Sequence, residues 1–512
     1  MTKTKRIQIL CLLGAVALLL SGCWTEAPVE SANGLLGDQE PVDQQEEVIL
    51  PAAFTLPYDP DQTLDPVTCA DGMQQVAGSL IYEGLFRLDR QLEPQPWLCQ
   101  SYTYDAASLT YTFTLRSGVT FSDGSPLTAA DAAATLRRAK SSQRYSARLA
   151  HVAAVSAGDG VVIVTLSRPD SSLPALLDIP IVKSGTEESL TPVGTGPYYF
   201  TTDEAGACLA SHSGWWRGES RPAERIALSA ARDREAILYQ FSSHEVQLIT
   251  ADLIGTEPIT ATGNISYEDA DTTVLQFLGF NTARAPFQDS AARRALGLGS
   301  NRETLVSAVL SGHARAAQFP VSPVSPLYPA ELESLYSYDD FAAAMEAAGL
   351  NTGRTRTVTL LVNQENTFKV SAAEHIAQAL SDFDLQIQVE ALPWEEYAAA
   401  LAAGNFDLYY GEVRLPANWD LSALVGTGGS LNYGGWADPQ TEQLLAACAA
   451  AEDRAAAVSD LCAYLQQQAP ILPLCFKSSS VLYQTGAVSG LTPTAAEPFY
   501  DLPSCQIHLR QP

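Results

Sequence analysis

The sequence is poor in positive charge. Its 512 residues include 30 Lys and Arg against 58 Asp and Glu, which gives a formal net charge of -28. A surface of this sign repels phosphate backbones and anionic lipid headgroups, so nucleic acid is excluded as a partner. Electrostatic steering of small ligands would favour cationic or zwitterionic ones.

Patterns that hold metals or build active sites are also missing. The six histidines are scattered without HxxH or HExxH spacing, and no CxxC pair occurs. There is no G-x-S-x-G motif and no S-x-x-K set with its partners, and the glycine-rich stretch 426–430 lacks the lysine of a phosphate loop. We therefore expect no metal, no cofactor, no catalytic residues and no enzymatic activity. A secreted hydrolase is the weakest alternative.

The sequence has only one long apolar run, and it lies at the start. A basic segment leads into the uncharged stretch 7–20, which is too short to span a bilayer. The run ends in Leu-Ser-Gly-Cys at 20–23, which resembles the lipobox of bacterial lipoproteins. We expect a signal peptide at 1–22, a lipid on Cys23, a flexible tether at 23–48 and a location on the extracytoplasmic face of the cell membrane. An ordinary secretory signal is the alternative.

Nine cysteines are present, and two of them belong to the N-terminal segment. The other seven are an odd number, so at least one must stay unpaired within the chain. Cys448, Cys462 and Cys475 lie in Ala- and Leu-rich surroundings, which favours buried, inert thiols. One or two disulfides remain possible in this compartment.

After residue 48, helical and strand patterns alternate. The period-two pattern of residues 109–116 predicts a half-buried strand, and Thr128 is a good N-cap for a helix that runs to residue 140. Further helices are expected at 73–80, 290–310, 338–348, 370–381, 394–403 and 439–469, and further strands at 53–56, 161–166, 357–362, 385–392 and 407–410. This alternation is typical of an α/β protein. About 460 residues exceed one hydrophobic core, so at least two lobes are expected.

A series of short strings carries a resemblance over most of the chain. They are TLDP (63–66), IYEGLF (81–86), YTFTLRSGVTFSDG (111–124), VGTGPY (193–198), LGFNT (278–282), WEEY (394–397), GNFD (404–407) and NYGGWADP (432–439). In this order and spacing they resemble the extracellular solute-binding proteins of the peptide/nickel type, family 5, which serve ABC importers.

The resemblance implies a bilobed, periplasmic-binding-protein-like fold of type II, the Venus flytrap, in which two mixed α/β lobes are joined by a hinge. Lobe 1 would comprise 49–276 with 480–512 returning to it, and lobe 2 would comprise 277–479. The crossing strands are expected near 277–282 and 472–480. Such a monomer would close on a ligand between its lobes and deliver it to ABC permease subunits.

Candidate ligand-binding residues follow from loops that would face the hinge. They are Asp65, Thr195, Gly196, Glu412, Arg414, Trp419, Asp420, Tyr433 and Trp436. The planar fork of Arg414 suits an anionic group of the ligand, and its alternative is a surface ion pair with Glu412. Tyr433 and Trp436 would form an aromatic wall or pack under the loop 426–429, and the glycines at 194 and 196 allow close backbone approach or simply a tight turn.

The segment 411–420 departs from the family pattern. Peptide binders of the family commonly carry a Trp after the glycine and an aspartate-rich run, whereas this chain has Glu412, Arg414 and Asp420. This departure weakens the peptide assignment but leaves solute binding intact. The sequence therefore predicts a substrate-binding lipoprotein of an ABC importer for a peptide or peptide-like solute. The alternative is a surface receptor that signals without transport.

Overall fold

The computed structural model describes residues 50–70, 72–259, 263–381 and 383–511 of the chain. These residues belong to one compact unit. The predicted signal peptide, the lipidated Cys23 and the tether to residue 48 lie outside the described residues. Within the described ranges, no helix combines the length and the apolar character needed to cross a membrane.

Small sheets build what we call the first region, residues 50–259 and 485–511. One sheet has the order β1 (Thr55–Tyr58), β12 (Arg225–Ala230), β11 (Gly206–Ser211), β10 (Tyr198–Asp203), and another has the order β5 (Cys99–Asp105), β6 (Thr110–Leu115), β8 (Val161–Leu166), β7 (Val152–Ala157). The remaining elements are α1 (Gly72–Ile81), β2 (Glu83–Gly84), β3 (Phe86–Leu88), β4 (Pro94–Pro96), α2 (Ala129–Ser141), β9 (Pro180–Ile181), α3 (Arg234–Ser242), β13 (Leu248–Ala251), β20 (Val488–Ser489) and β21 (Gln506–Ile507).

The predicted strand and helix around residues 109–140 form for the expected reasons. In β6, Tyr111 and Phe113 alternate with less buried threonines and point into the core that α2 covers. At the start of α2, the Thr128 side chain accepts a hydrogen bond from the Asp131 backbone N–H, and the Asp131 side chain accepts one from the Thr128 N–H. This capping box satisfies two N–H groups that a helix start leaves without partners.

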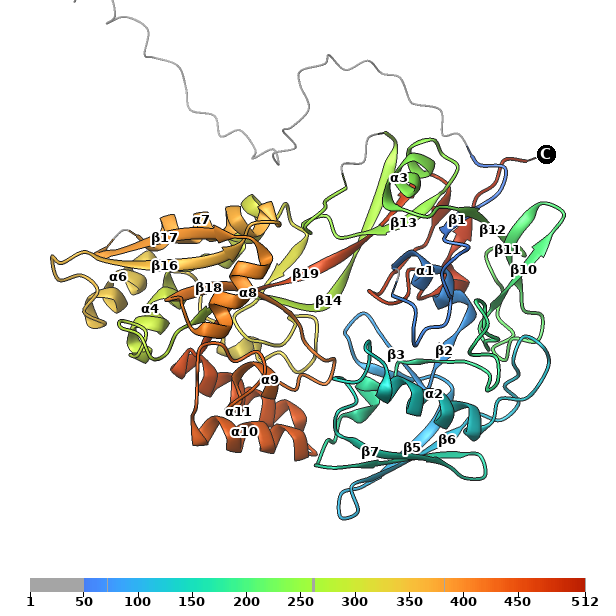
Figure 1. Cartoon of the computed structure of the whole chain (residues 1–512), viewed down its shortest axis with the longest axis horizontal. Helices are drawn as coiled ribbons and strands as arrows, with labels where there is room; N and C mark the ends of the chain where they lie inside the picture. Colours follow the sequence, from blue (N-terminus) through green and yellow to red (C-terminus); the bar gives the residue numbers. More distant parts are fainter. Residues whose placement is uncertain (1–49, 71, 260–262, 382, 512) are drawn as a thin grey trace, which may run out of the picture. The chain divides into compact units, whose positions relative to one another are not determined.

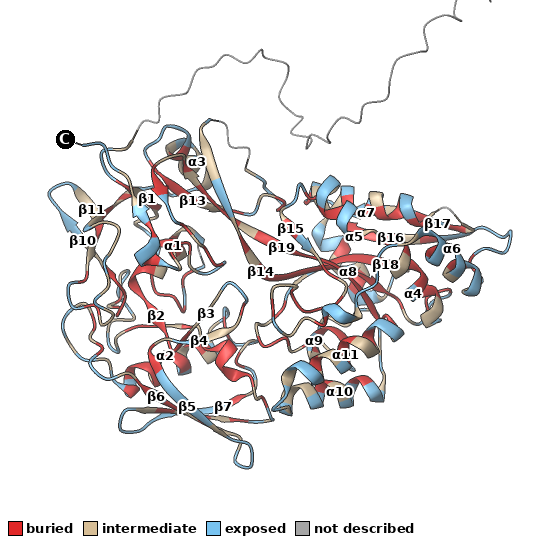
Figure 2. Ribbon diagram, turned by 180° about the vertical axis from the view of Figure 1, so that it is seen from behind, coloured by how far each residue is buried: buried red, intermediate tan, exposed pale blue. Residues whose placement is uncertain are grey.

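One larger sheet organises the second region, residues 281–470. Its strand order is β13, β19 (Ile471–Gln484), β14 (Ile265–Phe280), β18 (Leu408–Arg414), β16 (Arg356–Asn363), β17 (Leu385–Leu392), and β15 (Ala314–Ala316) pairs with β19. The helices are α4 (Ser290–Gly299), α5 (Arg302–Thr304), α6 (Tyr338–Ala347), α7 (Thr367–Leu380), α8 (Trp394–Ala403), α9 (Ser422–Val425), α10 (Pro439–Ala450) and α11 (Arg454–Gln468). Figure 2 shows strands β16 and β18 mostly buried and the outer faces of helices such as α7 and α10 exposed.

Strands β14 and β19 connect the two regions. They run antiparallel beside each other, as Figure 1 shows, from β13 at one end to β18 at the other. Their pairing is interrupted by a register shift between Asp271 and Leu275, where the Thr272 hydroxyl donates instead to the Lys477 backbone oxygen at 2.6 Å. A second register shift lies between Gln276 and Phe277. The irregularities therefore lie just before and at the start of the crossing expected at 277–282, while Lys477 falls inside the range expected for the return. The division into two lobes stays a prediction.

Two predicted helices are wrong as continuous elements. The helix expected at 290–310 ends at Gly299, and Asn301 caps a new start by accepting a hydrogen bond from the Thr304 N–H. The helix expected at 439–469 ends at residue 450, and Asp453 caps α11 by accepting from the Ala456 N–H. In both places a short Asn or Asp side chain offers the backbone a local partner, which competes with helix continuation.

Candidate ligand-binding site

A network of charges lies where the crossing strands meet β18. Glu412 is on β18, and its Oε2 is 3.3 Å from the Nζ atoms of both Lys369 and Lys477. Gln276 of β14 donates to the same oxygen at 2.9 Å. Lys477, only 5 % exposed, also contacts Asp252 Oδ2 at 2.5 Å, just beyond the end of β13. The network therefore links the first region, a crossing strand and the second region.

The lysines decide the protonation of Glu412. Burial acts to raise its pKa, but the positive charges of Lys369 and Lys477 outweigh burial, and the pKa is lowered. Burial likewise lowers the pKa of Lys369, although Glu412 opposes that shift. Glu412 therefore stays ionised and engaged with the lysines, which leaves it poorly placed to bind a ligand ammonium group.

Arg414 lies two residues further along β18, on the same side of the strand as Glu412. It is exposed, and it makes no hydrogen bond or ion pair with any residue in the described ranges. The ion pair with Glu412 that was the alternative for Arg414 is thus not formed. Burial by the surrounding protein still lowers the pKa of Arg414, which is expected of a side chain that protein surrounds without covering.

A second set of contacts joins the two regions away from the charge network. Asn418 Nδ2 donates to Asp170 Oδ2 at 3.1 Å, and Arg168 donates to Asp420 Oδ2 at 2.6 Å. Trp419 between them is 4 % exposed and adopts the left-handed backbone conformation, with φ of 56°. Trp419, which is expected to contact ligand, is therefore buried, and Asp420, which is also expected to contact ligand, pairs with Arg168 of the first region.

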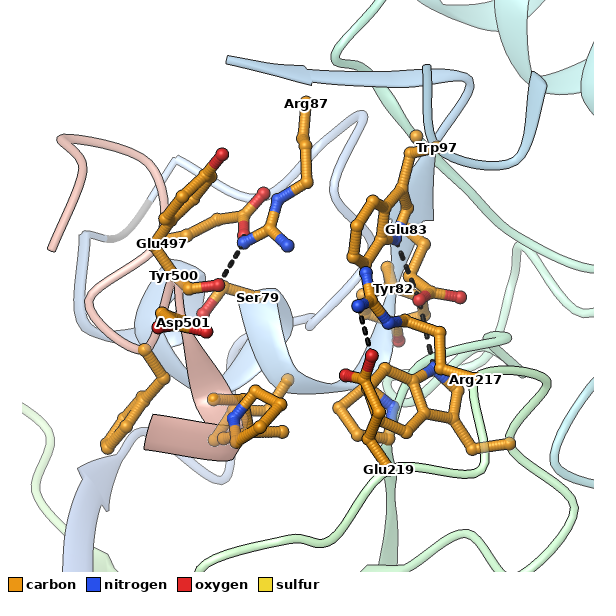
Figure 3. Close-up of a pocket in the computed structure, with 17 residues that line it drawn as sticks. Ser79, Tyr82, Glu83, Arg87, Trp97, Arg217, Glu219, Glu497, Tyr500 and Asp501 are labelled. Carbon is orange, nitrogen blue, oxygen red and sulfur yellow. Dashed lines mark hydrogen bonds and ion pairs between the residues drawn. The ribbon is translucent and has the colours of Figure 1, made fainter. Parts of the chain in front are cut away.

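The most elaborate polar cluster lies elsewhere, inside the first region. Glu83 Oε1 accepts hydrogen bonds from the indole N–H groups of Trp97, Trp215 and Trp216 at 2.9, 3.0 and 3.2 Å. Thr195 donates to Glu83 Oε2 at 2.8 Å. Burial raises the pKa of Glu83, and these neutral donors offset only part of that shift. Figure 3 shows Glu83 between Trp97 and the side chains near Arg217.

Arginines and aromatic rings alternate beside Glu83. The Arg87 guanidinium lies 3.9 Å from the Tyr500 ring centroid and 4.2 Å from that of Trp97, and Arg217 lies 4.5 Å from the other side of Trp97. Arg87 pairs with Glu497 at 2.5 Å, and Arg217 pairs with Glu219, as Figure 3 shows. Each guanidinium therefore already has a carboxylate and an aromatic face, which favours a structural role for the cluster.

The volume of a cavity indicates whether it can hold a ligand. The cavity beside Glu83 has about 70 Å³ of room for solvent-sized molecules, and the one lined by Asp170, Trp419 and Arg454 has about 20 Å³. Pockets for drug-sized ligands span roughly 300 to 1,000 Å³. Neither of these two cavities is large enough to hold a peptide.

Three candidates from the first region are occupied within the protein. Asp65 is 1 % exposed; its Oδ1 accepts from the Val67 N–H, and its Oδ2 accepts from Thr68 and pairs with Arg138. Thr195 is fully buried against Glu83. A Cβ at position 196 would lie 2.6 Å from the Ile81 carbonyl oxygen, so Gly196 allows a close approach of backbone to backbone. These three residues already have partners or close neighbours within the first region.

The two aromatic candidates differ from each other. Trp436 is half-buried, donates from Nε1 to Thr441 Oγ1 at 3.1 Å and lies under the guanidinium of Arg293. Tyr433 is 36 % exposed, and its ring meets Tyr409 edge to face with centroids 6.1 Å apart. Of the pair, only Tyr433 presents a ring that a ligand could cover.

No disulfide joins the seven cysteines of the described ranges, and burial raises the pKa of the Cys448 thiol to about 11 and of the Cys475 thiol to about 12. Among the same residues, no three His, Cys, Asp or Glu side chains gather as a metal site would require.

Sequence reasoning missed Glu83, Lys369 and Lys477. A glutamate within the apolar string IYEGLF is a signal for the first, because such a residue is buried and must find donors. No local signal identifies the lysines, since their shared partner lies on another strand.

Comparisons with known proteins agree with this architecture. The model of the bacterial extracellular solute-binding proteins, family 5 (middle), matches residues 93–432. The glutathione-binding protein GsiB of Escherichia coli (strain K12) is 28 % identical over 357 residues, which cover 66 % of this chain and 69 % of that protein.

Solved structures show the same fold. The nickel ABC transporter structure from Bacillus halodurans has a TM-score of 0.73 at 21 % identity, covering 87 % of this chain and 98 % of that one. The oligopeptide-binding protein AppA of Bacillus subtilis, in complex with a nonapeptide, has a TM-score of 0.60 at 18 % identity, covering 90 % and 100 %. The predicted α/β, periplasmic-binding-protein-like fold class is confirmed.

Proposed function

The chain belongs to the bacterial extracellular solute-binding proteins of family 5, and on this premise we propose that it captures a peptide or peptide-like solute between two lobes for an ABC importer. The observation that carries the proposal is the pair of long strands, β14 and β19, that joins the regions through an interrupted register. The similar proteins are named as a glutathione-binding protein, an oligopeptide-binding protein in complex with a nonapeptide, and a nickel ABC transporter.

The strand pair supports a hinge. Around Thr272 the β14 backbone leaves its ladder with β19, so fewer backbone hydrogen bonds resist a change of angle there than on either side. The charge network of Asp252, Lys477 and Glu412 bridges the same place. A solute that touches both lobes stabilises the closed arrangement by contacts that the open one lacks, and the permease reads the resulting shape.

The proposed ligand contacts are Arg414 and Tyr433, with Glu412 in the floor beneath them. Arg414 has a charge without a partner, and Tyr433 has a ring with an open face. Glu412 acts through the lysines that it holds rather than through direct contact. The solute would approach from outside the cell, with Cys23 carrying the lipid that retains the protein at the membrane.

A ligand screen tests the function. Thermal unfolding of the protein would be followed in the presence of di-, tri- and oligopeptides and of glutathione. Solutes that raise Tm would then be confirmed by calorimetry. A solute at 100 times its Kd adds about 2.7 kcal/mol to the unfolding free energy, which raises Tm by several degrees. The proposal fails if no peptide or glutathione raises Tm, or if the protein converts its ligand to product.

Localisation is a separate test. Replacing Cys23 with Ser removes the acceptor for the lipid, so the protein should move from the membrane fraction to the medium or periplasm. Cys11→Ser, within the signal segment, serves as the matched control and should leave the mature protein membrane-bound. Retention of the Cys23→Ser protein at the membrane would refute the anchor.

A further inference from the structure

One hydrophobic cluster of the second region holds a side chain from the first region. The cluster is built from residues of the second region and of the crossing strands β14 and β19, and Leu92 is its one buried member from elsewhere in the described ranges. Leu92 lies in the turn between β3 and β4, yet it is only 5 % exposed. Because the side chains of a surface turn are usually exposed to water, the turn must be docked against the second region.

The turn that carries Leu92 is held in shape by Asp89. The Asp89 side chain accepts hydrogen bonds from the backbone N–H groups of Gln91 and Glu93, each at 2.9 Å. The Leu92 N–H donates to the Asp89 carbonyl oxygen, also at 2.9 Å. Because these partners all belong to the turn itself, we expect the turn to keep its shape without the second region. It therefore presents Leu92 as a preformed plug.

Each region contributes a bulky residue in the left-handed backbone conformation to this cluster. Leu92 has a φ of 62°, and Trp419 of the second region has a φ of 56°. Side chains with a Cβ avoid this conformation, and bulky residues adopt it only where the surrounding structure compensates for the strain. Strained positions of this kind concentrate at sites that switch between two states. Their meeting in one contact therefore favours a switching role over ordinary core packing.

Polar contacts accompany the docked turn. Ser325 Oγ of the second region donates to Glu93 Oε1 at 3.4 Å. In the other set of contacts between the regions, the residue after Asp170 also takes part, because the Ser171 N–H donates to the Ala449 carbonyl oxygen at 2.8 Å. Each of these pairs consists of groups of the chain itself. The contact between the regions therefore requires no solute.

From this placement we infer that the turn at residues 89–93 is a latch that holds the two regions together when no solute is bound. The inference rests on the proposed function, in which the regions separate to admit a solute, and it adds what joins them beforehand. The latch opens when Leu92 leaves the hydrophobic cluster. Because the same contact breaks before a solute enters and before it leaves, the latch controls the rates of both steps without touching the solute.

Amide hydrogen exchange tests the latch without a ligand. The Ser171 N–H loses its Ala449 partner when the regions separate, so its exchange rate in the solute-free protein measures how often the latch opens. Leu92→Ala removes most of the plug and makes opening less unfavourable. We expect exchange at Ser171 to accelerate by about tenfold or more, because the apolar surface that opening exposes is smaller.

Leu401→Ala is the matched control. Leu401 lies on α8, belongs to the same hydrophobic cluster and is likewise 5 % exposed, but it comes from the second region. Both substitutions should lower Tm, because each leaves a cavity in the cluster. Only Leu92→Ala should accelerate exchange at Ser171. Equal acceleration by both variants, or none by either, would overturn the inference, since Ser171 would then be exposed by unfolding or by a motion that does not involve Leu92.

Leu92→Gly separates loss of the side chain from disturbance of the turn. Glycine adopts positive φ without steric cost, so this variant suits the φ of 62° at position 92. It should accelerate exchange at Ser171 as Leu92→Ala does. If Leu92→Ala accelerates exchange and Leu92→Gly does not, the cause is a distorted turn, and the latch is overturned.

Small-angle X-ray scattering tests whether the solute-free protein is latched. Leu92→Ala should have a larger radius of gyration than the wild type, because more of its molecules have the two regions apart. Leu401→Ala should match the wild type. A wild type that is as expanded as Leu92→Ala would overturn the inference, because its regions would already be separated.

Failure of the latch and failure of the proposed function give different results. If Leu92→Ala leaves exchange and scattering unchanged while peptides or glutathione still raise Tm, the latch is wrong and solute binding stands. If exchange and scattering change as expected but no solute in the screen raises Tm, the latch stands as a motion of this fold and the proposed function is removed.

Discussion

Two glutamates, one in each region, have pKa values that are shifted in opposite directions. Glu83 of the first region accepts hydrogen bonds from three indole N–H groups and a threonine hydroxyl, all neutral, and its pKa is raised. Glu412 of the second region accepts from two lysines and a glutamine, and its pKa is lowered. Burial acts in the same direction on both carboxyl groups. What differs is whether their donors carry charge.

The difference shows how the molecule separates architecture from function. Neutral donors such as the indoles orient a carboxylate but do not fully compensate for the desolvation of its charge. Cationic donors do compensate for this desolvation, and they also add positive charge to the site. The Glu83 cluster is therefore neutral apart from its carboxyl group, whereas the Glu412 network brings several charges together.

Removing the charge of Glu412 should have the largest effect. Glu412→Gln leaves Lys369 without an ionised partner, and Lys477 keeps only Asp252. We expect a loss of about 2 to 3 kcal/mol in the free energy of unfolding, below the range for a fully buried pair because 23 % of the Glu412 side chain is exposed. Urea melts measure it. Glu374→Gln, at an exposed site on α7, should change stability by less than about 0.5 kcal/mol.

The same change at Glu83 should cost less. Glu83→Gln removes a charge whose burial is unfavourable, but its amide N–H group then faces indole donors. These effects oppose each other, and we expect a net loss of about 1 kcal/mol, again from urea melts. A loss larger than that of Glu412→Gln would contradict the view that neutral donors stabilise the ionised carboxylate only weakly.

The pH dependences of the two sites should have opposite signs. The folded pKa of Glu412 lies below its usual value of 4.5, so its stabilisation is complete above 4.5 and is lost as pH falls through the folded pKa. The folded pKa of Glu83 lies above 4.5, so the ionised form is penalised above that folded pKa, and the penalty disappears as pH falls below 4.5.

Urea melts of the wild type and both Gln variants at pH 7 and near pH 4 measure these signs. On acidification, the stability advantage of the wild type over Glu412→Gln should shrink. The stability advantage of the wild type over Glu83→Gln should instead grow on acidification. Shifts in the same direction for both pairs would contradict the assignment of opposite pKa changes.

The smallest change in stability is expected for an ion pair that is exposed to solvent. Arg168 and Asp420 join the two regions at 2.6 Å, but their side chains are 40 % and 28 % exposed. Arg168→Gln should cost no more than about 0.5 kcal/mol, and 0.5 M salt should abolish the difference. A salt-independent cost above 1 kcal/mol would show that this contact, like the Glu412 network, is shielded from solvent.

Much of the fold was predictable because its signals are local. The alternation of residues 109–116 and the Thr128 cap led to β6 and α2 nearly to the residue. The errors at 299–301 and 451–453 came from Asn and Asp caps inside long helical patterns. The candidates Arg414, Asp65, Trp419 and Trp436 came from the resemblance, which places their loops at the hinge. Which of these side chains find partners within the protein, as Asp65 and Trp436 do, depends on contacts between distant segments.

The sequence alone determined the acidic balance, the alternation of strands and helices and the resemblance to solute-binding proteins, because each is a property of composition or of neighbours along the chain. Only the tertiary structure decided that Glu83 meets three tryptophans and that Glu412 meets two lysines. The partners of these charges lie up to 225 residues apart, as Asp252 and Lys477 do. No pattern within one segment encodes which of them will be neighbours.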